Sequence, residues 1–478
     1  MGAISGVEYI RRIDQLQSDV WIHGEQVKGN ISEHFAYKGV IKSQAALYDL
    51  QLDSSLQDVM TYRSPGTGDR VGTSYMIPQT KEDLEKRRLM VQEWARTHAG
   101  MLGRSPDYMN TALMSFAASK HLLEGEKNCF PDHIQAVYER AREKDLSFTH
   151  AFINPQVNRS AHYFTEDDDD TIAAKVVDRN DEGLVVRGGK LLATQGGITD
   201  EMIVYSTANV MDKSYAYAFS IPTNTEGLRF ICRESFSGRE STFDYPLSSR
   251  FEEVDALVVF DDVVVPWERV FYYDNIQAPA KLTGEGSFTN MAMHQVVSRQ
   301  VVKLEFVLGV AQQIVDTINI SEYQHVQEKL AEMIMTLESM KALLLKAEIE
   351  AEEDHGVMIP ALKPLYAAVT TFQRQYPKMT EFIQLLGASG MISIPTEKDF
   401  EEVIRGDLDK YLQAKTKNAE ERVKLFRLAW DLCMSSFGTR QSLYEKFFFG
   451  DPIRLMGALY FKYDKSRFVD RVSQFLNN

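Results

Sequence analysis

The sequence predicts a multidomain α and β protein, in which a helical N-terminal domain, an antiparallel β middle domain and a C-terminal helical bundle follow one another. Its 478 residues are about three times the commonest domain size, so several domains are expected. Apolar residues recur at helical spacing in both outer parts, and short β-branched runs lie between them. We therefore expect domains over residues 1–150, 151–280 and 281–478.

The N-terminal part shows the helical pattern in two clear stretches. Apolar or bulky residues lie three and four positions apart at Leu89, Met90, Trp94 and His98, and again at Leu113, Phe116 and Ala117. Such spacing places these side chains on one face of a helix. A set of amphipathic helices is expected here.

The middle part changes to short runs of β-branched and aromatic residues. Turn chemistry such as Asn180-Asp181-Glu182-Gly183 and Gly188-Gly189 divides them. The predicted strands lie within residues 172–177, 184–186, 202–205, 215–221 and 257–260. A small antiparallel sheet or barrel is expected.

After about residue 285 the helical period returns and is sustained. One stripe is Val301, Leu304, Leu308, Ala311 and Val315, and another is Leu330, Met333, Leu337, Met340 and Leu344. Long amphipathic helices bury such stripes against each other, which predicts a bundle. The absence of regular strand and helix alternation argues against a doubly wound sheet.

Composition excludes several classes of function. The net charge of −15 is unfavourable for binding nucleic acid or an anionic membrane, and no apolar run is long enough to span a bilayer. Three dispersed cysteines without a CxxC pair predict neither a disulfide framework nor a thiolate metal site. With no apolar leader pattern at its start, the chain is expected to be soluble and cytoplasmic. No phosphate-loop, nicotinamide-binding or metal motif is present, so no metal is expected.

The segment Gly103-Arg104-Ser105-Pro106-Asp107-Tyr108 is unusual for a loop between helices. Pro106 can open a helix with Ser105 as its N-cap, which would put Arg104 just before the turn and Tyr108 in the first turn. Both side chains could then face one pocket. The structural alternative, that Arg104 pairs with Asp107 while Tyr108 packs in the core, stays open.

A second segment, Thr149 to Arg159, lies where the pattern changes from helices to strands. It interleaves amides and an arginine with apolar residues around Pro155, as a site for a large planar polar ligand requires. His150 within it can serve as a proton acceptor or as an ordinary buried histidine.

Together these segments resemble the two-component flavin-dependent phenol hydroxylases, the family of the 4-hydroxyphenylacetate 3-monooxygenase oxygenase component. The resemblance extends along essentially the whole chain. It includes Gly6–Ile10, His23–Val27, Phe260–Glu268 and Phe448–Pro452. Several motifs in the right order make the resemblance specific.

The resemblance implies a fold like that of acyl-CoA dehydrogenases, with a four-helix bundle as its C-terminal domain and usually a homotetramer. It implies that Arg104, Tyr108 and His150 hold the phenol oxygen and that Ser206 and Thr207 contact the substrate's carboxylate from a mobile loop. It also implies that flavin is held by residues in several regions, namely His150, Gln156, Val157, Asn158, Arg159, Thr194, Gly387, Phe449, Gly450, Asp451 and Pro452.

These residue types suit the hydroxylation of a phenol to a catechol. A phenolate ring is a better nucleophile than a phenol, whose pKa is about 10. Arg104 offers a permanent positive charge, Tyr108 a hydroxyl donor and His150 a proton acceptor. The resemblance implies FAD as cofactor, used as FADH2 that a separate NAD(P)H:flavin reductase supplies, together with O2 and a phenolic substrate such as 4-hydroxyphenylacetate.

Two other enzymes and one scaffold remain as alternatives. An iron–sulfur dehydratase of the same fold needs three cysteines, which the chain lacks near Gly100–Gly103 and after His294. An acyl-CoA dehydrogenase would use a glutamate base and tightly held FAD. A non-catalytic flavin-binding scaffold would not need the Arg104, Tyr108 and His150 set. The loop that selects the substrate, roughly residues 195–209, departs from the family's usual pattern at Gly196–Thr199.

Overall fold

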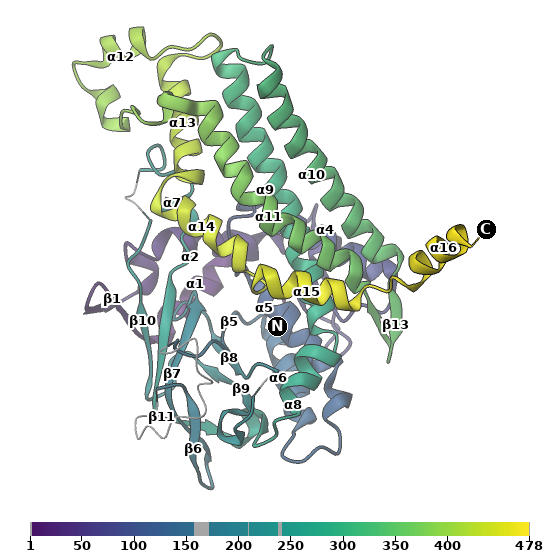
Figure 1. The fold of residues 1–478 in the computed structure, drawn as a ribbon. Helices are drawn as coiled ribbons and strands as arrows, with labels where there is room; N and C mark the ends of the chain where they lie inside the picture. The colour runs from purple at the N-terminus through teal and green to yellow at the C-terminus, as the bar shows by residue number, and fades with distance from the viewer. Residues whose placement is uncertain (1, 157–171, 209, 238–240, 478) are drawn as a thin grey trace.

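The computed structural model describes residues 2–156, 172–208, 210–237 and 241–477. The predicted flavin residues Val157, Asn158 and Arg159 lie outside these ranges. Figure 1 shows the N-terminal helices and the strands at one end of the molecule and a bundle of long helices rising from them. The longer helices of the first part are α1 (Gly6–Leu16), α2 (Lys38–Leu50), α4 (Lys81–Thr97), α5 (Pro106–Ala118) and α6 (Pro131–Lys144).

Local sequence signals explain where key helices begin. Thr80 and Asp83 form a capping box at the start of α4, and Asn418 and Glu421 do the same for α13 (Ala419–Cys433). The predicted helical stretches at residues 89–98 and 113–117 are confirmed as parts of α4 and α5. Their apolar faces are buried in the main core.

The described strands of the middle part form two main sheets. One has the order β2 (Glu25–Gln26), β1 (Asp19–Ile22), β10 (Leu228–Cys232), β11 (Asp255–Pro266), β7 (Gly183–Thr194) and β6 (Lys175–Arg179). The other has the order β12 (Val270–Tyr273), β9 (Tyr217–Pro222), β8 (Glu201–Tyr205) and β5 (Phe148–Ala151). Most neighbouring strands are antiparallel, as expected.

Two strand pairs are parallel and join distant parts of the chain. β1, from the N-terminal part, pairs with β10 in the register Val20 to Phe230. β5 pairs with β8, and His150 lies opposite Ile203. The first sheet therefore includes a strand from a region whose sequence pattern predicted only helices.

The C-terminal part is a bundle of α9 (Phe288–Ile318), α10 (Gln324–Ile349), α11 (Leu362–Gly387) and α13. The two predicted apolar stripes are buried or partly buried between these helices. α14 (Ser436–Phe447) and α15 (Pro452–Lys462) then run across the base of the bundle, and α16 (Ser466–Leu476) projects away from the body (Figure 1). Along the described ranges, no helix is both long enough and apolar enough to cross a bilayer.

Candidate active site

The loop before α5 is held from a distant part of the chain. Glu253, which precedes β11, accepts the N–H of Gly103 at Oε2 (2.8 Å) and the N–H of Arg104 at Oε1 (2.7 Å). A Cβ at Gly103 would collide with the ring of Tyr444 on α14, so the loop requires glycine there. The loop is thus fixed on both sides by residues far away in the sequence.

Ser105 is the N-cap residue of α5, as predicted, and Pro106 is the first helical residue. The Ser105 hydroxyl makes no capping hydrogen bond to the helix and instead donates to the Asp107 carboxylate. Asp107 also accepts a hydrogen bond from Gln295 on α9 (2.7 Å), and burial raises its pKa. The carboxylate of Asp107 thus bonds to Ser105 and Gln295 and not to Arg104. The structural alternative, in which Arg104 pairs with Asp107, is therefore wrong.

The guanidinium of Arg104 lies between two aromatic rings. Its central carbon is 4.2 Å from the ring centroid of Tyr108 and 4.2 Å from that of Phe448, just after α14. Rings at this distance attract a cation. Arg104 Nε donates to His150 Nε2 at 3.3 Å, and the three predicted phenol-binding residues thus form one buried group.

His150 lies on β5 and is bonded at both ring nitrogens. Nε2 accepts from Arg104, and Nδ1 lies 3.2 Å from the hydroxyl oxygen of Tyr205. Burial, and next the positive charge of Arg104, lower the pKa of His150 well below its usual value. The imidazole is therefore neutral at physiological pH and can accept a proton.

Tyr108 packs edge-on against His150, with ring centroids 5.9 Å apart and an interplanar angle of 77°. Burial raises the pKa of its hydroxyl, and the Arg104 charge opposes that rise. Tyr108 is thus a protonated hydroxyl that can donate a hydrogen bond beside the arginine. The group contains one permanent cation, one neutral base and one hydroxyl donor.

The structure separates the two predicted carboxylate contacts. Ser206 is buried, and its hydroxyl donates to the Tyr217 carbonyl (2.9 Å) and accepts from the Tyr217 N–H (3.0 Å). Thr207, one residue further on, is exposed. In this conformation Thr207 can reach a ligand, whereas Ser206 holds the loop to β9.

Several of the predicted flavin residues lie in three separate places. Phe449 to Pro452 follow directly after Phe448 in the chain; Gly450 has a φ of 128°, and Asp451 caps α15. Thr194 ends β7, where its hydroxyl donates to Asp255 at 2.8 Å. Gly387 is the last residue of α11, next to Met391, and has no contact with Arg104 among the described interactions.

The residues of the middle region offer groups that fit a flavin. Gln156 is exposed at the start of that region. Lys190 is buried, and its ammonium group donates to Asn154 Oδ1 at 2.7 Å. Burial lowers the pKa of Lys190 to about 7. A cation and amides next to Pro155 match the polar edge and phosphates of such a cofactor.

Sequence reasoning did not single out Glu253, Tyr205 or Phe448 as site residues. Glu253 left no signal, because a carboxylate that binds main-chain N–H groups far along the chain has no local pattern. Tyr205 and Phe448 stand next to predicted residues, in Tyr205-Ser206-Thr207 and Phe448–Pro452. Their closeness in the sequence to predicted site residues is the signal that could have identified them.

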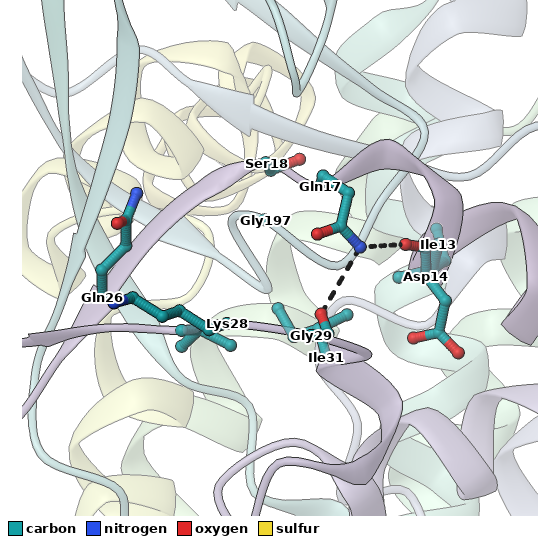
Figure 2. Close-up of a pocket in the computed structure, with 10 residues that line it drawn as sticks. Ile13, Asp14, Gln17, Ser18, Gln26, Lys28, Gly29, Ile31 and Gly197 are labelled. Carbon is teal, nitrogen blue, oxygen red and sulfur yellow. Dashed lines mark hydrogen bonds between the residues drawn. The ribbon is translucent and has the colours of Figure 1, made fainter.

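A separate small pocket is lined mainly by residues of α1, β2 and the segment that follows β2. Its volume is about 210 Å³, and Figure 2 shows Gln17 at its centre, donating to the carbonyls of Asp14 (2.6 Å) and Gly29 (3.4 Å). Gly197 contributes part of the wall. Within the described part of the chain, no predicted site residue lines this pocket.

Comparisons with known proteins agree with this geometry. Models of the 4-hydroxyphenylacetate 3-hydroxylase N-terminal and C-terminal regions match residues 5–272 and 280–477. A probable 4-hydroxyphenylacetate 3-monooxygenase of Bacillus subtilis (strain 168) is 55% identical over 100% of this chain and 99% of the relative.

Solved structures agree as well. The oxygenase component of 4-hydroxyphenylacetate 3-monooxygenase, in complex with FAD and 4-hydroxyphenylacetate, superposes with a TM-score of 0.94, 42% identity, and coverage of 99% of this chain and 98% of that chain. An archaeal 4-hydroxybutyryl-CoA dehydratase from N. maritimus, 21% identical with a TM-score of 0.89 over 99% and 95% of the two chains, shares the fold.

The chain has the fold of these two structures. Its matches at 42% and 55% identity define it as a flavin-dependent aromatic monooxygenase. The chain belongs to the 4-hydroxyphenylacetate 3-hydroxylase family.

His294 on α9 is bonded to Glu348 Oε1 at 2.9 Å. In the described ranges, no group of three or more His, Cys, Asp or Glu residues can hold a metal ion.

Proposed function

We propose that this protein is the oxygenase component of a two-component monooxygenase, which uses FADH2 and O2 to hydroxylate a phenol at the ortho position. The observation that carries the proposal is the buried group of Arg104, Tyr108 and His150, with Arg104 Nε 3.3 Å from a neutral His150 Nε2. 4-Hydroxyphenylacetate is the substrate that the family membership favours.

The three side chains are suited to ionise and orient a phenol. The phenol oxygen would bind beside Arg104 and His150 and displace their direct hydrogen bond, so that Nε2 accepts the phenol proton and the guanidinium stabilises the phenolate. Tyr108 would donate a hydrogen bond to the same oxygen. The rings of Tyr108 and Phe448 exclude water and so strengthen these charge interactions.

We assign the flavin to the side of this group formed by Gln156, Lys190 and residues 449–452. When bound, the reduced flavin supplies the reaction with dioxygen. Lys190 would offer positive charge to it, and main-chain groups around Gly450 would approach it closely because glycine has no Cβ. Thr194 would border the flavin through packing, since its hydroxyl donates to Asp255 and its carbonyl accepts from Thr149.

The carboxylate of an acidic substrate would meet Thr207. Its exposure, beside a Ser206 that anchors the loop to β9, supports this role. Ser206 would act by holding the loop in place. This assignment refines the expectation that both hydroxyls touch the carboxylate.

We also propose a homotetramer, served by a separate NAD(P)H:flavin reductase. α16 buries no residue, yet its side chains Phe468, Val469, Val472, Phe475 and Leu476 form an exposed apolar stripe. Such a stripe on a projecting helix favours packing against another copy of the chain. The three cysteines are free thiols, which suits the reducing cytoplasm. The domain boundaries remain as proposed, near residues 150 and 280.

The test is aerobic turnover with a flavin reductase, NADH, FAD and 4-hydroxyphenylacetate. The expected product is the catechol, formed in a fixed ratio to NADH consumed. Arg104→Ala should lower that ratio at least tenfold while NADH oxidation continues, because flavin is still oxidised without a held phenol. Arg96→Ala, which removes an exposed arginine paired with Glu93 on α4, is the matched control and should match the wild type.

Two results would contradict the proposal. Absence of catechol from a panel of acidic and neutral phenols would favour a flavin-binding scaffold. Bleaching of oxidised flavin by an acyl-CoA under anaerobic conditions would favour a dehydrogenase. The panel would also show whether the loop of residues 195–209 selects 4-hydroxyphenylacetate or a neutral phenol.

A further inference from the structure

Tyr205 ends β8, and packing fixes the place of its ring. The ring stacks on Phe152 with centroids 5.2 Å apart and an interplanar angle of 13°, and it meets Phe116 edge-on at 5.8 Å. Because β8 pairs with β5, the hydroxyl is brought to 3.2 Å from His150 Nδ1. The position of this hydroxyl is therefore set by the fold.

The direction of each hydrogen bond at His150 follows from its partners. A guanidinium can only donate, so Nε2, which faces Arg104 Nε, must be the nitrogen with the lone pair. A neutral imidazole carries a single N–H, which must then be on Nδ1. That N–H has the oxygen of Tyr205 as its acceptor.

We propose that Tyr205 is a positioning residue: as the acceptor for Nδ1–H it works with Arg104 at Nε2 to hold His150 in the Nδ1–H tautomer and to keep Nε2 on the side where the phenol binds. The other tautomer would set an Nε2–H against the Arg104 Nε–H. The other charged or titratable groups that face His150 are Arg104 and Tyr108. The phenol part of this inference rests on the proposed function, but the tautomer does not.

The tautomer can be read directly from ¹⁵N chemical shifts of histidine-labelled protein without ligands. His150→Gln identifies the signal of His150. The wild type should show a protonated Nδ1 and an unprotonated Nε2, and Tyr205→Phe, which keeps the packed ring but leaves the Nδ1–H buried without its acceptor, should shift these signals. A protonated Nε2 in the wild type, or an unchanged pattern in Tyr205→Phe, would overturn the proposal.

Tyr138→Phe is the matched control. Tyr138 is also buried, and its hydroxyl donates to a main-chain carbonyl, that of Tyr75, at 2.7 Å. It lies on α6, which carries none of the site residues. This variant should leave the His150 signals as they are in the wild type, so that loss of any buried hydroxyl is distinguished from loss of the acceptor for Nδ1–H.

The consequence for the phenol is measured with 4-nitrophenol, whose ionised form absorbs visible light. Its bound phenolate-to-phenol ratio at a given pH should fall about three- to tenfold in Tyr205→Phe, the effect of one lost hydrogen bond. An unchanged ratio would refute the link between Tyr205 and phenol ionisation. If the wild type binds no 4-nitrophenol at all, the phenol-binding function fails, while the tautomer result is unaffected.

Discussion

Glu253 holds Arg104 through the main chain: its carboxylate accepts the Arg104 N–H at 2.7 Å and the N–H of the preceding Gly103 at 2.8 Å. It also accepts from Gln195 Nε2 at 2.9 Å, and it is fully buried. Arg440 on α14 lies 3.6 Å from it. The Glu253 carboxylate thus fixes the main-chain position from which the Arg104 side chain extends.

Glu253→Gln should weaken both the fold and the coupling of the reaction. An amide has only one acceptor atom, so one of the two main-chain N–H groups loses its partner inside the protein. The free energy of unfolding should fall by about 1–3 kcal/mol, and catechol per NADH should fall as the Arg104 loop loosens. Urea unfolding and product analysis measure the two effects.

The matched control for this change is Glu350→Gln. Glu350 forms an exposed pair with Lys346 at the end of α10, so its replacement should change stability by less than about 0.5 kcal/mol. Equal effects of the two variants on stability and coupling would show that Glu253 does not anchor the Arg104 loop.

Thr207→Ala should mainly affect acidic substrates. Because Thr207 is exposed and Ser206 is tied to Tyr217, only the threonine hydroxyl is free to meet a carboxylate. We expect KM for 4-hydroxyphenylacetate to rise about three- to tenfold, with little change for a neutral phenol. Ser206→Ala should impair both substrates alike, and steady-state kinetics with an acidic and a neutral phenol decide between these patterns. The same loss for both substrates in Thr207→Ala would contradict this role.

His98 should make the protein less stable in acid. Burial, and then the charges of Arg299 and Lys303, lower the pKa of His98 to about 3. Its pKa in the unfolded chain is about 6.5, so below that pH only the unfolded state takes up the proton. This contribution to stability is fully present above pH 6.5 and is lost by about 1.4 kcal/mol per pH unit below it, or about 2 kcal/mol at pH 5.

The measurement is urea unfolding of the wild type and His98→Asn at pH 7 and pH 5. Asparagine cannot titrate and can still accept the Leu102 N–H that His98 Nδ1 now accepts at 3.1 Å. The variant should therefore lose less stability between the two pH values. His325→Asn, at an exposed position on α10, should behave as the wild type. An identical loss of stability in wild type and His98→Asn would exclude this origin.

Removal of α16 should lower the oligomeric state without unfolding the chain. A stop codon after Tyr463 deletes a helix that buries no side chain of its own, so circular dichroism should keep the signal of the remaining helices. Sedimentation should show smaller particles. Val472→Asp, which places a charge in the apolar stripe, should act in the same direction. Ser473→Ala is the conservative control, and unchanged sedimentation of the truncated chain would refute the role of α16.

The helices could be predicted because their signals are local. The stripe of Leu330, Met333 and Leu337 repeats within a few turns, and α10 buries it as expected. The pairing of β1 with β10 could not be predicted in this way. It joins Asp19 to Arg229, and no pattern within either short strand specifies a partner that far along the chain.

The sequence predicted which residues gather near the site better than it predicted which atoms each of them contacts. Arg104, Tyr108 and His150 were expected together and do meet. Ser206 was expected to face the ligand, but its hydroxyl is used by the main chain of Tyr217, because a buried hydroxyl must find partners. Residue type alone does not tell which of two adjacent hydroxyls is free.

The position of α14 against the Arg104 loop limits how members of this family can be recombined. Arg440, Tyr444 and the following Phe448 all lie near Arg104 or its anchor Glu253. A chimera cut between the β part and the bundle would set a foreign helix against a native loop. We expect functional chimeras only when the segment around residue 104 and α14 come from the same parent, even though about 330 residues lie between them.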